Sequence, residues 1–226
     1  MKKFLFLFLI LFAHFSLAQT DKINPKTPPT KDIFFKKENT PNAAPTQKIK
    51  QIHSDSINRK PDLYGGNMFF DGNVEFQHNG AVLTANRVVF YQKENFVKAI
   101  GNVVLVTSDG NRITAEEMEY DGETQRGIAR KNVVLTDPKQ TIKTETLYYD
   151  RISNKAYFNT GGTISDASNV MYTKSATYDL SSKMIDFTGN VKINNPEYTV
   201  EGTNIKQNQN TNTADFFGPT TITNKQ

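Results

Sequence analysis

A repeat of about 29 residues constrains the fold of this 226-residue chain more than any other feature. A glycine or its counterpart, mostly followed by Asn and Val, recurs at positions 72, 101, 131, 161, 189 and 218, at intervals of 29, 30, 30, 28 and 29. Near-equal intervals are typical of stacked repeats, because a single unit cannot bury its own apolar face without neighbours. The chain is therefore expected to stack copies of one unit into an elongated body.

Each interval contains three short segments in which apolar and polar residues alternate. In the first complete unit they are 74–76, 83–91 and 96–100, separated by turns such as His78–Gly80. Alternation of this kind is typical of strands with one buried face, and no helical periodicity is present. The glycine before each first strand suits a bulge at which the chain turns a corner.

We therefore predict an all-β fold, an elongated β-jellyroll or solenoid-like stack of about five 29-residue repeats with open ends. The spacing alone does not distinguish an irregular jellyroll from a three-sided helix. No mixed or helical class fits, since no stretch repeats its apolar residues at helical intervals.

The chain divides into three parts. Residues 1–18 are expected to be a Sec-type signal peptide, with Lys2 and Lys3 before an apolar run and small residues at Ser16 and Ala18 for cleavage. An uncleaved membrane anchor is the alternative, although the run is shorter than a spanning helix needs. Residues 19–65 are rich in Pro, Lys, Asn and Thr and are expected to be a flexible linker. The β-domain is placed at 66–226.

The charge distribution argues against nucleic acid as a partner. The formal net charge is +4, but residues 19–60 hold 9 Lys and Arg against 4 Asp and Glu, whereas residues 61–226 hold 16 against 19. The positive charge therefore belongs to the signal and linker and not to a folded face. The absence of Cys also excludes disulfides, thiolate metal sites and a lipidated cysteine.

The sequence does not favour an enzyme, and we expect no catalytic residues, no metal site and no cofactor. Only three His are present, and His53 and His78 stand in the linker and a turn without a placed nucleophile. The acidic run Glu116–Glu123 alternates with apolar residues on a strand and lacks calcium-loop spacing, so it is interpreted as a solvated face.

The repeat units resemble the OstA/LptA-type family of lipopolysaccharide transport proteins. The resemblance is carried by Leu83–Asn86, Ile113–Glu116, Thr144–Asp150, Ala99–Val103 and Phe187–Val191, and it covers about 67–223. It implies a periplasmic β-jellyroll that holds the lipid A acyl chains of lipopolysaccharide in an apolar groove. It also implies end-to-end stacking with same-fold domains of inner- and outer-membrane export components, with association to either membrane left open. The long Pro-rich linker and the weak unit at Thr160–Ser165 depart from the family pattern.

Period-2 alternation and this resemblance together give the candidate site residues. The predicted walls of the lipid groove are Phe76, Phe90, Leu105, Tyr120, Leu135, Tyr149, Tyr178, Ile185 and Phe187. The alternative is that these side chains fill a dry core. The predicted end-to-end interface, which would support a head-to-tail homo-oligomer, is formed by Met68, Phe69, Phe70, Thr221 and Ile222. The alternative there is capping of the ends by the linker or the C-terminal tail.

Three functional interpretations stay open at this point. The first is a lipopolysaccharide carrier or bridge in transport to the outer membrane. The second is a structural β-repeat protein of the envelope without lipid cargo. The third is an inner-membrane-anchored component of the same fold, which would keep its N-terminal helix.

Overall fold

The computed structural model describes residues 47–225, so the predicted signal peptide and the predicted linker up to residue 46 lie outside the described residues. Within them the chain forms strands and one short 3₁₀-helix, η1 (Tyr64–Gly66). The strands are β1 (Lys50–His53), β2 (Ser56–Arg59), β3 (Met68–His78), β4 (Ala81–Tyr91), β5 (Phe96–Val106), β6 (Arg112–Asp121), β7 (Arg126–Thr136), β8 (Thr141–Asp150), β9 (Lys155–Phe158), β10 (Gly162–Ser165), β11 (Val170–Thr173), β12 (Ser175–Asp179), β13 (Met184–Asn194), β14 (Tyr198–Asn208) and β15 (Thr213–Asn224). The predicted all-β class is confirmed.

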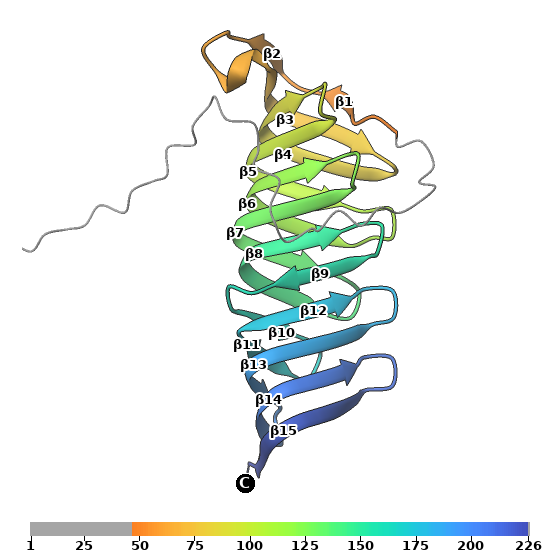
Figure 1. The fold of residues 1–226 in the computed structure, drawn as a ribbon, viewed down its shortest axis with the longest axis vertical. Coiled ribbons are helices and arrows are strands. Elements are labelled where there is room, and N and C mark those ends of the chain that lie inside the picture. The colour runs from red at the N-terminus through yellow and green to blue at the C-terminus, as the bar shows by residue number, and fades with distance from the viewer. Residues whose placement is uncertain (1–46, 226) are drawn as a thin grey trace, which may run out of the picture.

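All fifteen strands belong to one antiparallel sheet in which consecutive long strands pair as hairpins. Figure 1 shows the strands stacked like rungs from β1 and β2 at one end to β15 at the other, so the molecule is elongated along the stacking direction. Neighbouring repeats contact each other along their full length, which is the arrangement the 29-residue period predicts.

Alternate long strands are bent at the repeated glycine and asparagine, which are Gly–Asn in β3, β5 and β13 and Lys131–Asn132 in β7. Between β5 and β6 the pairing passes from Ile100 with Glu117 to Val103 with Ala115, so Gly101 and Asn102 together oppose one residue. Both have positive φ, 76° and 49°. Two residues against one define a β-bulge, and Gly and Asn are the residues that adopt positive φ most readily. The predicted bulge is thus confirmed, and it lies within one continuous strand and not between two separate ones.

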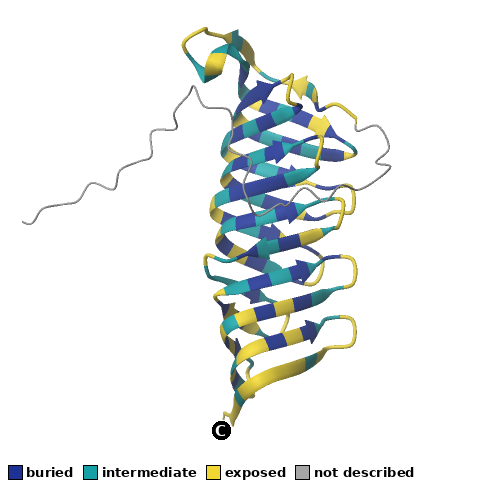
Figure 2. Cartoon of the chain, in the orientation of Figure 1, coloured by how far each residue is buried: buried dark blue, intermediate teal, exposed yellow. Residues whose placement is uncertain are grey.

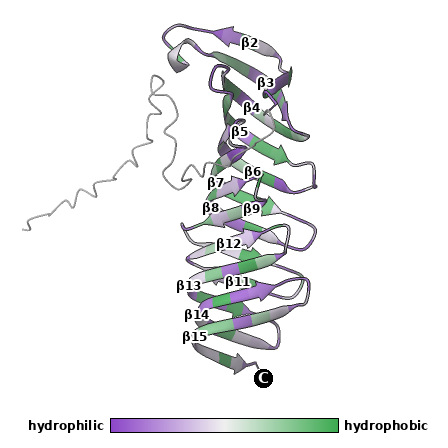
Figure 3. Ribbon diagram, turned by 45° about the vertical axis from the view of Figure 1, so that its right-hand side comes forward, coloured by the Kyte–Doolittle hydropathy of each residue, from purple (hydrophilic) through white to green (hydrophobic). Residues whose placement is uncertain are grey.

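The row of bulges folds the sheet into two facing walls, one formed by the strand halves before the bulges and one by the halves after them. Side chains on the inner faces form a single hydrophobic cluster from Ile49 to Ile205. Figures 2 and 3 show buried and apolar positions alternating with exposed and polar ones along the strands of the stack, except β15 at the C-terminal end, which is exposed over most of its length. The architecture is therefore a β-jellyroll with two walls and not a three-sided helix.

The weak repeat at Thr160–Ser165 is where the bent strand is interrupted. β9 and β10 are the two halves of one strand and both pair with β8, on opposite sides of Thr160 and Gly161. β11 and β12 are likewise the halves of the next strand and both pair with β13. The stack continues through this region without a gap.

Strands are present before the predicted domain boundary at residue 66. β1 pairs with Glu75–Gln77, β2 pairs with Met68–Asp71, and the backbone N–H of Asp55 donates to the carbonyl groups of Asp71 and Gly72 between them. β1 and β2 are thus one more bent strand of the stack, although they fall in the predicted linker. The sequence does not predict these two strands, because residues 47–60 are polar except for Ile49, Ile52 and Ile57, and three apolar residues are too few to show an alternating pattern.

Candidate functional site

The interior between the two walls contains all nine predicted lipid-contacting side chains. Each belongs to the single hydrophobic cluster, and their exposed fractions lie between 0 and 8%. Aromatic contacts link some of them, as in the edge-to-face pair of Phe76 and Phe90, whose ring centroids are 5.4 Å apart. The structure therefore brings the predicted set together on one apolar surface, and in this conformation that surface is closed to solvent.

Two rows of turns face each other along the edge of the walls opposite the bulges. Row A consists of the turns at 92–95, 122–125, 151–154, 180–183 and 209–212, and row B of those at 79–80, 107–111, 137–140, 166–169 and 195–197. Several row A turns follow an Asp or Asn whose side chain accepts hydrogen bonds from the turn amides, as Asp150 does from Ile152 and Ser153. We call the line between the two rows the seam.

Near the N-terminal end of the stack, Arg151 of row A forms hydrogen bonds to the first turn of row B. Its guanidinium donates to the carbonyl oxygens of His78 (3.2 Å) and Asn79 (3.0 Å) and to the Tyr120 hydroxyl (3.1 Å). His78 Nε2 donates to the Gln47 carbonyl at 2.7 Å, so its Nδ1, 2.9 Å from Tyr120 Oη, accepts. Burial lowers the pKa of His78 and the nearby Arg151 charge adds to this; together they outweigh the hydrogen bond to the Gln47 carbonyl, which raises the pKa, so the neutral imidazole is favoured.

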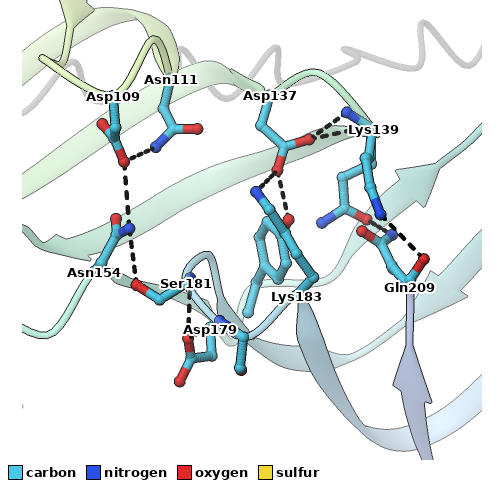
Figure 4. A network of polar contacts seen from close by, with 12 residues as sticks. Asp109, Asn111, Asp137, Lys139, Asn154, Asp179, Ser181, Lys183 and Gln209 are labelled. Carbon is cyan, nitrogen blue, oxygen red and sulfur yellow. Dashed lines mark hydrogen bonds and ion pairs between the residues drawn. The ribbon is translucent and has the colours of Figure 1, made fainter. Parts of the chain in front are cut away.

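In the middle of the seam, Asn154 bridges the rows (Figure 4). Its Nδ2 donates to Asp109 Oδ2 in row B at 3.2 Å and to Ser181 Oγ at 3.1 Å, while its Oδ1 accepts from Tyr149 Oη at 3.0 Å. Burial raises the pKa of Tyr149 to about 12, with the Asp109 carboxylate adding to the effect, so this hydroxyl stays a donor.

A further cross-link of the seam is made by Asp137, whose side chain is fully buried. Figure 4 shows its carboxylate beside Lys183 and Lys139. Its carboxylate accepts from Lys183 Nζ at 2.8 Å, from Tyr178 Oη at 2.5 Å, and from the backbone amides of Lys139 and Gln140. Burial alone raises the pKa of Asp137, but these hydrogen bonds outweigh it and leave the pKa below its ordinary value. Burial and the same carboxylate raise the pKa of Tyr178.

Beyond Asp137 the seam opens into a pocket of about 570 Å³ at the C-terminal end of the interior. Its apolar walls are formed by Ile193, Tyr198, Val200, Ala214 and Phe216. Its polar lining includes Gln207 and Gln209, and the side-chain Oε1 atoms of both are buried without a hydrogen-bond partner within the described part of the chain. The volume lies within the range of small-molecule sites, about 300–1,000 Å³.

The two ends of the stack differ. At the C-terminal end β15 pairs only with β14 among the described strands, so its other edge is open. Phe217 and Ile222 on β15 are 53% and 60% exposed. Thr221 and Ile222, two residues of the predicted end-to-end interface, therefore lie on this open edge. At the N-terminal end β2 pairs with the backbone of Met68–Asp71, and Phe70 is buried in the interior.

Phe69 packs on the opposite face of β3 with Val89 and Tyr91, under Leu63 and Tyr64. The prediction of Met68, Phe69 and Phe70 as an open edge is therefore corrected. The segment that precedes them in the chain covers them, since β2 satisfies their backbone groups and Leu63 and Tyr64 cover the ring of Phe69.

The acidic run on β6 lies on the outer face, as interpreted from the sequence. Glu119 pairs with Lys98 (3.0 Å) and Arg130 (3.1 Å), and Glu117 pairs with Lys131 (2.7 Å). Among residues 47–225 no group of His, Asp and Glu side chains is arranged to hold a metal ion. In the same range no helix has the length and apolarity to cross a membrane.

Sequence reasoning missed the seam and the pocket. No sequence motif marks the residues that form them, which are Arg151, Asp137 and Lys183 in the seam and Gln207 in the pocket. One signal was present: Tyr120, Tyr149 and Tyr178 recur every 29 residues at the end of a strand, and Gln207 follows 29 residues after Tyr178. The glutamine that replaces tyrosine in this 29-residue series marks the repeat in which the packing of the interior changes.

Three known proteins or families are similar to this chain. A family model described as OstA-like protein matches residues 46–203. The LPS-assembly protein LptD of Polaromonas sp. is 32% identical over 82 residues, which is 36% of this chain and 10% of that protein, so the chain spans about a tenth of that relative. The periplasmic component LptH of Pseudomonas aeruginosa, described as homologous to LptA, aligns in structure with a TM-score of 0.45 and 14% identity over 49% of this chain and 84% of that chain. Since the family match spans more than two thirds of the sequence and nearly all of the folded repeats, the chain belongs to the OstA-like protein family.

Proposed function

We propose that this protein is a periplasmic lipopolysaccharide carrier that holds acyl chains between the two walls of its jellyroll and bridges toward the outer membrane. The observation that carries the proposal is the continuous hydrophobic cluster along the whole interior, from Ile49 to Ile205. The membership in the OstA-like family and the partial match to an LPS-assembly protein support the same cargo.

The energetics favour acyl chains as the cargo. Each methylene transferred from water into an apolar interior gains about 0.8 kcal/mol, so about ten methylenes supply about 8 kcal/mol. Because the nine predicted contacts are nearly inaccessible in this conformation, the chains enter when the walls part at the seam. The seam is held by hydrogen bonds and ion pairs, each with a net contribution of about 1 kcal/mol, which the gain can offset.

End-to-end transfer is the second part of the proposal. β15 offers twelve residues of unpaired edge with one charged side chain, Asp215, and exposes Phe216, Phe217 and Ile222. Long edges without protecting charges favour strand addition. A same-fold domain of the inner- or outer-membrane export components, or a second copy of this chain, would add its strand there.

The other candidate is a structural envelope protein without lipid cargo. The tight closure of the interior is as compatible with this candidate as with the carrier, because a dry core and a closed lipid groove have the same packing in the absence of cargo. The two candidates differ in whether the walls separate.

Retention of lipopolysaccharide tests the proposal. Full-length protein is incubated with purified lipopolysaccharide and separated by size-exclusion chromatography, and acyl chains in the protein peak are measured by mass spectrometry. We expect retention near one lipid per chain. Recovery of no more lipid than a bystander protein carries would contradict the carrier and favour the structural candidate.

A locked seam is the matched control. The chain has no cysteine, so the double variant Asp109→Cys and Asn154→Cys places a unique thiol pair across the seam, where the native side chains are 3.2 Å apart. A short thiol–thiol crosslinker should prevent uptake, and the same variant without crosslinker should take up lipid.

A further inference from the structure

The pocket at the C-terminal end of the interior has a definite cause. Tyr178 crosses the seam to Asp137, which lies 41 residues earlier, and closes the interior there. In the next repeat the tyrosine is replaced by Gln207, and Asp166 lies 41 residues before it. The Asp166 carboxylate accepts from the amides of Ser168 (2.9 Å) and Asn169 (2.8 Å), as Asp137 does from its own turn, but its Oδ2 accepts from the Asn169 side chain (3.2 Å) in place of a tyrosine hydroxyl. Both Gln207 and Asp166 line the pocket, and a shorter side chain in place of the aromatic ring leaves the space empty.

Gln207 supplies this pocket with a hydrogen-bond acceptor, so the pocket favours a ligand that carries a donor. Its side chain is 7% exposed, and its Oε1 atom is buried without a hydrogen-bond partner within the described residues. Gln209 Oε1 is in the same state, while its Nε2 donates to Gln140 Oε1. Buried acceptors are almost always satisfied in folded proteins, so an unsatisfied acceptor that lines a pocket indicates a missing donor. A hydroxyl or an amide N–H supplies that donor.

The rim and the walls restrict the ligand further. Lys139 stands at the rim, and its ammonium donates to neutral oxygens, the Gln209 carbonyl (3.3 Å) and Asn210 Oδ1 (3.0 Å). The walls inside are apolar, with Ile193 and Val200 continuous with the hydrophobic cluster of the interior. A cation at the rim, acceptors just inside and an apolar wall beyond fit an amphiphile that enters with its polar end last.

We propose that this pocket binds the polar end of an acyl chain that carries a hydroxyl or amide N–H near its anionic head. The donor pairs with Gln207 Oε1, the chain runs along Ile193 and Val200 into the interior, and the anionic group lies beside Lys139. This assignment rests on the proposed carrier function and adds to it a selectivity for acyl chains with a donor.

The absence of Trp from the chain allows a direct binding assay. Phe216→Trp places one reporter in the pocket wall, and its emission should shift to shorter wavelength when an acyl chain arrives. The probes are tetradecanoic acid and 3-hydroxytetradecanoic acid, which differ by one hydroxyl. We expect the hydroxylated acid to bind about 3- to 10-fold more tightly, the usual effect of one added hydrogen bond. Equal affinities for the two acids would overturn the assignment.

Substitutions at residue 207 provide the controls in the same reporter background. Gln207→Leu keeps the space but removes the acceptor, so the preference for the hydroxylated acid should vanish while both acids still bind. Gln207→Tyr refills the pocket as Tyr178 fills its own level, so both acids should lose binding. Gln77→Leu changes an exposed glutamine of β3 at the other end and should leave the preference intact. A preference that survives Gln207→Leu would contradict the proposal, and far-ultraviolet circular dichroism confirms that each variant is folded.

Two further arms separate this inference from the carrier function. Competition by purified lipopolysaccharide identifies that lipid as the source of the acyl chain, whereas hydroxylated acid that binds without such competition assigns the pocket to free hydroxylated fatty acids. If lipopolysaccharide is retained in the chromatography test but the Phe216→Trp reporter does not respond, the pocket assignment fails alone. If the reporter responds and no lipopolysaccharide is retained, the carrier function fails alone.

Discussion

At the scale of single residues, the seam depends on a small number of buried polar groups. Asp137 unites a lysine, a tyrosine and two backbone amides on one carboxylate with no exposed surface. Its partners include Lys183 of row A and the backbone amides of Lys139 and Gln140 in row B, so it links the two rows across the seam. Arg151 does the same nearer the N-terminus, through carbonyl groups that no sequence motif marks.

The ionisation of Asp137 makes this cross-link acid-sensitive. Because its folded-state pKa lies below the unfolded value, the carboxylate stabilises the fold above the unfolded pKa, and this stabilisation is lost as the pH falls through the folded pKa. We expect Asp137→Asn to lower the free energy of unfolding by about 3 kcal/mol at neutral pH, the usual cost of breaking a buried ion pair. Denaturant unfolding at a series of pH values should show this difference shrinking below about pH 4.

An exposed ion pair provides the control for that experiment. Asp186 pairs with Lys206 at 3.2 Å with about half of each side chain in solvent, so Asp186→Asn should change stability by less than about 1 kcal/mol at any pH. A difference for Asp137→Asn that stays constant down to about pH 2 would show that the carboxylate charge does not hold the seam.

At the scale of elements, the bent strand is the unit of this fold and was largely predictable. Gly101 and Asn102 stand between two segments in which apolar and polar residues alternate. The residue pair predicts the bulge, which the positive φ of both residues confirms, and the alternation predicts the two faces of the strand. The pairing of β1 and β2 was not predictable in this way, because their four-residue segments carry too few apolar residues and are defined by the edge of β3 that they cover. Strand pairing of that kind is fixed by the tertiary structure and not by local pattern.

The exposed edge of β15 leads to a prediction at the same scale. If strand addition at this edge drives self-association, the molar mass from light scattering should rise with concentration. Ile222→Lys should shift that rise to at least about tenfold higher concentration, since an edge lysine opposes strand addition. Ile152→Lys, which changes an equally exposed isoleucine in a row A turn, should have no effect. A strict monomer at every concentration would contradict head-to-tail association.

At the scale of the whole molecule, the period predicts the stack and the alternation predicts which side chains lie inside. All nine predicted interior residues, from Phe76 to Phe187, lie in one cluster. The closure of the interior was not predictable, because the contacts of Arg151 with His78 and of Tyr178 with Asp137 join residues 73 and 41 positions apart through the geometry of facing turns. The pocket was not predicted either, although Gln207 interrupts the tyrosine column in a way that the sequence displays.

Site-specific photocrosslinking tests whether acyl chains lie between the walls, on which the carrier function depends. A photoreactive phenylalanine analogue replaces Tyr149, which faces the interior, or its neighbour Tyr148, which faces outward against Tyr157. The protein is expressed in cells that make lipopolysaccharide and is illuminated. We expect lipopolysaccharide adducts at position 149 and almost none at position 148. Adducts only to protein at position 149, or equal lipid labelling at both positions, would contradict the carrier function.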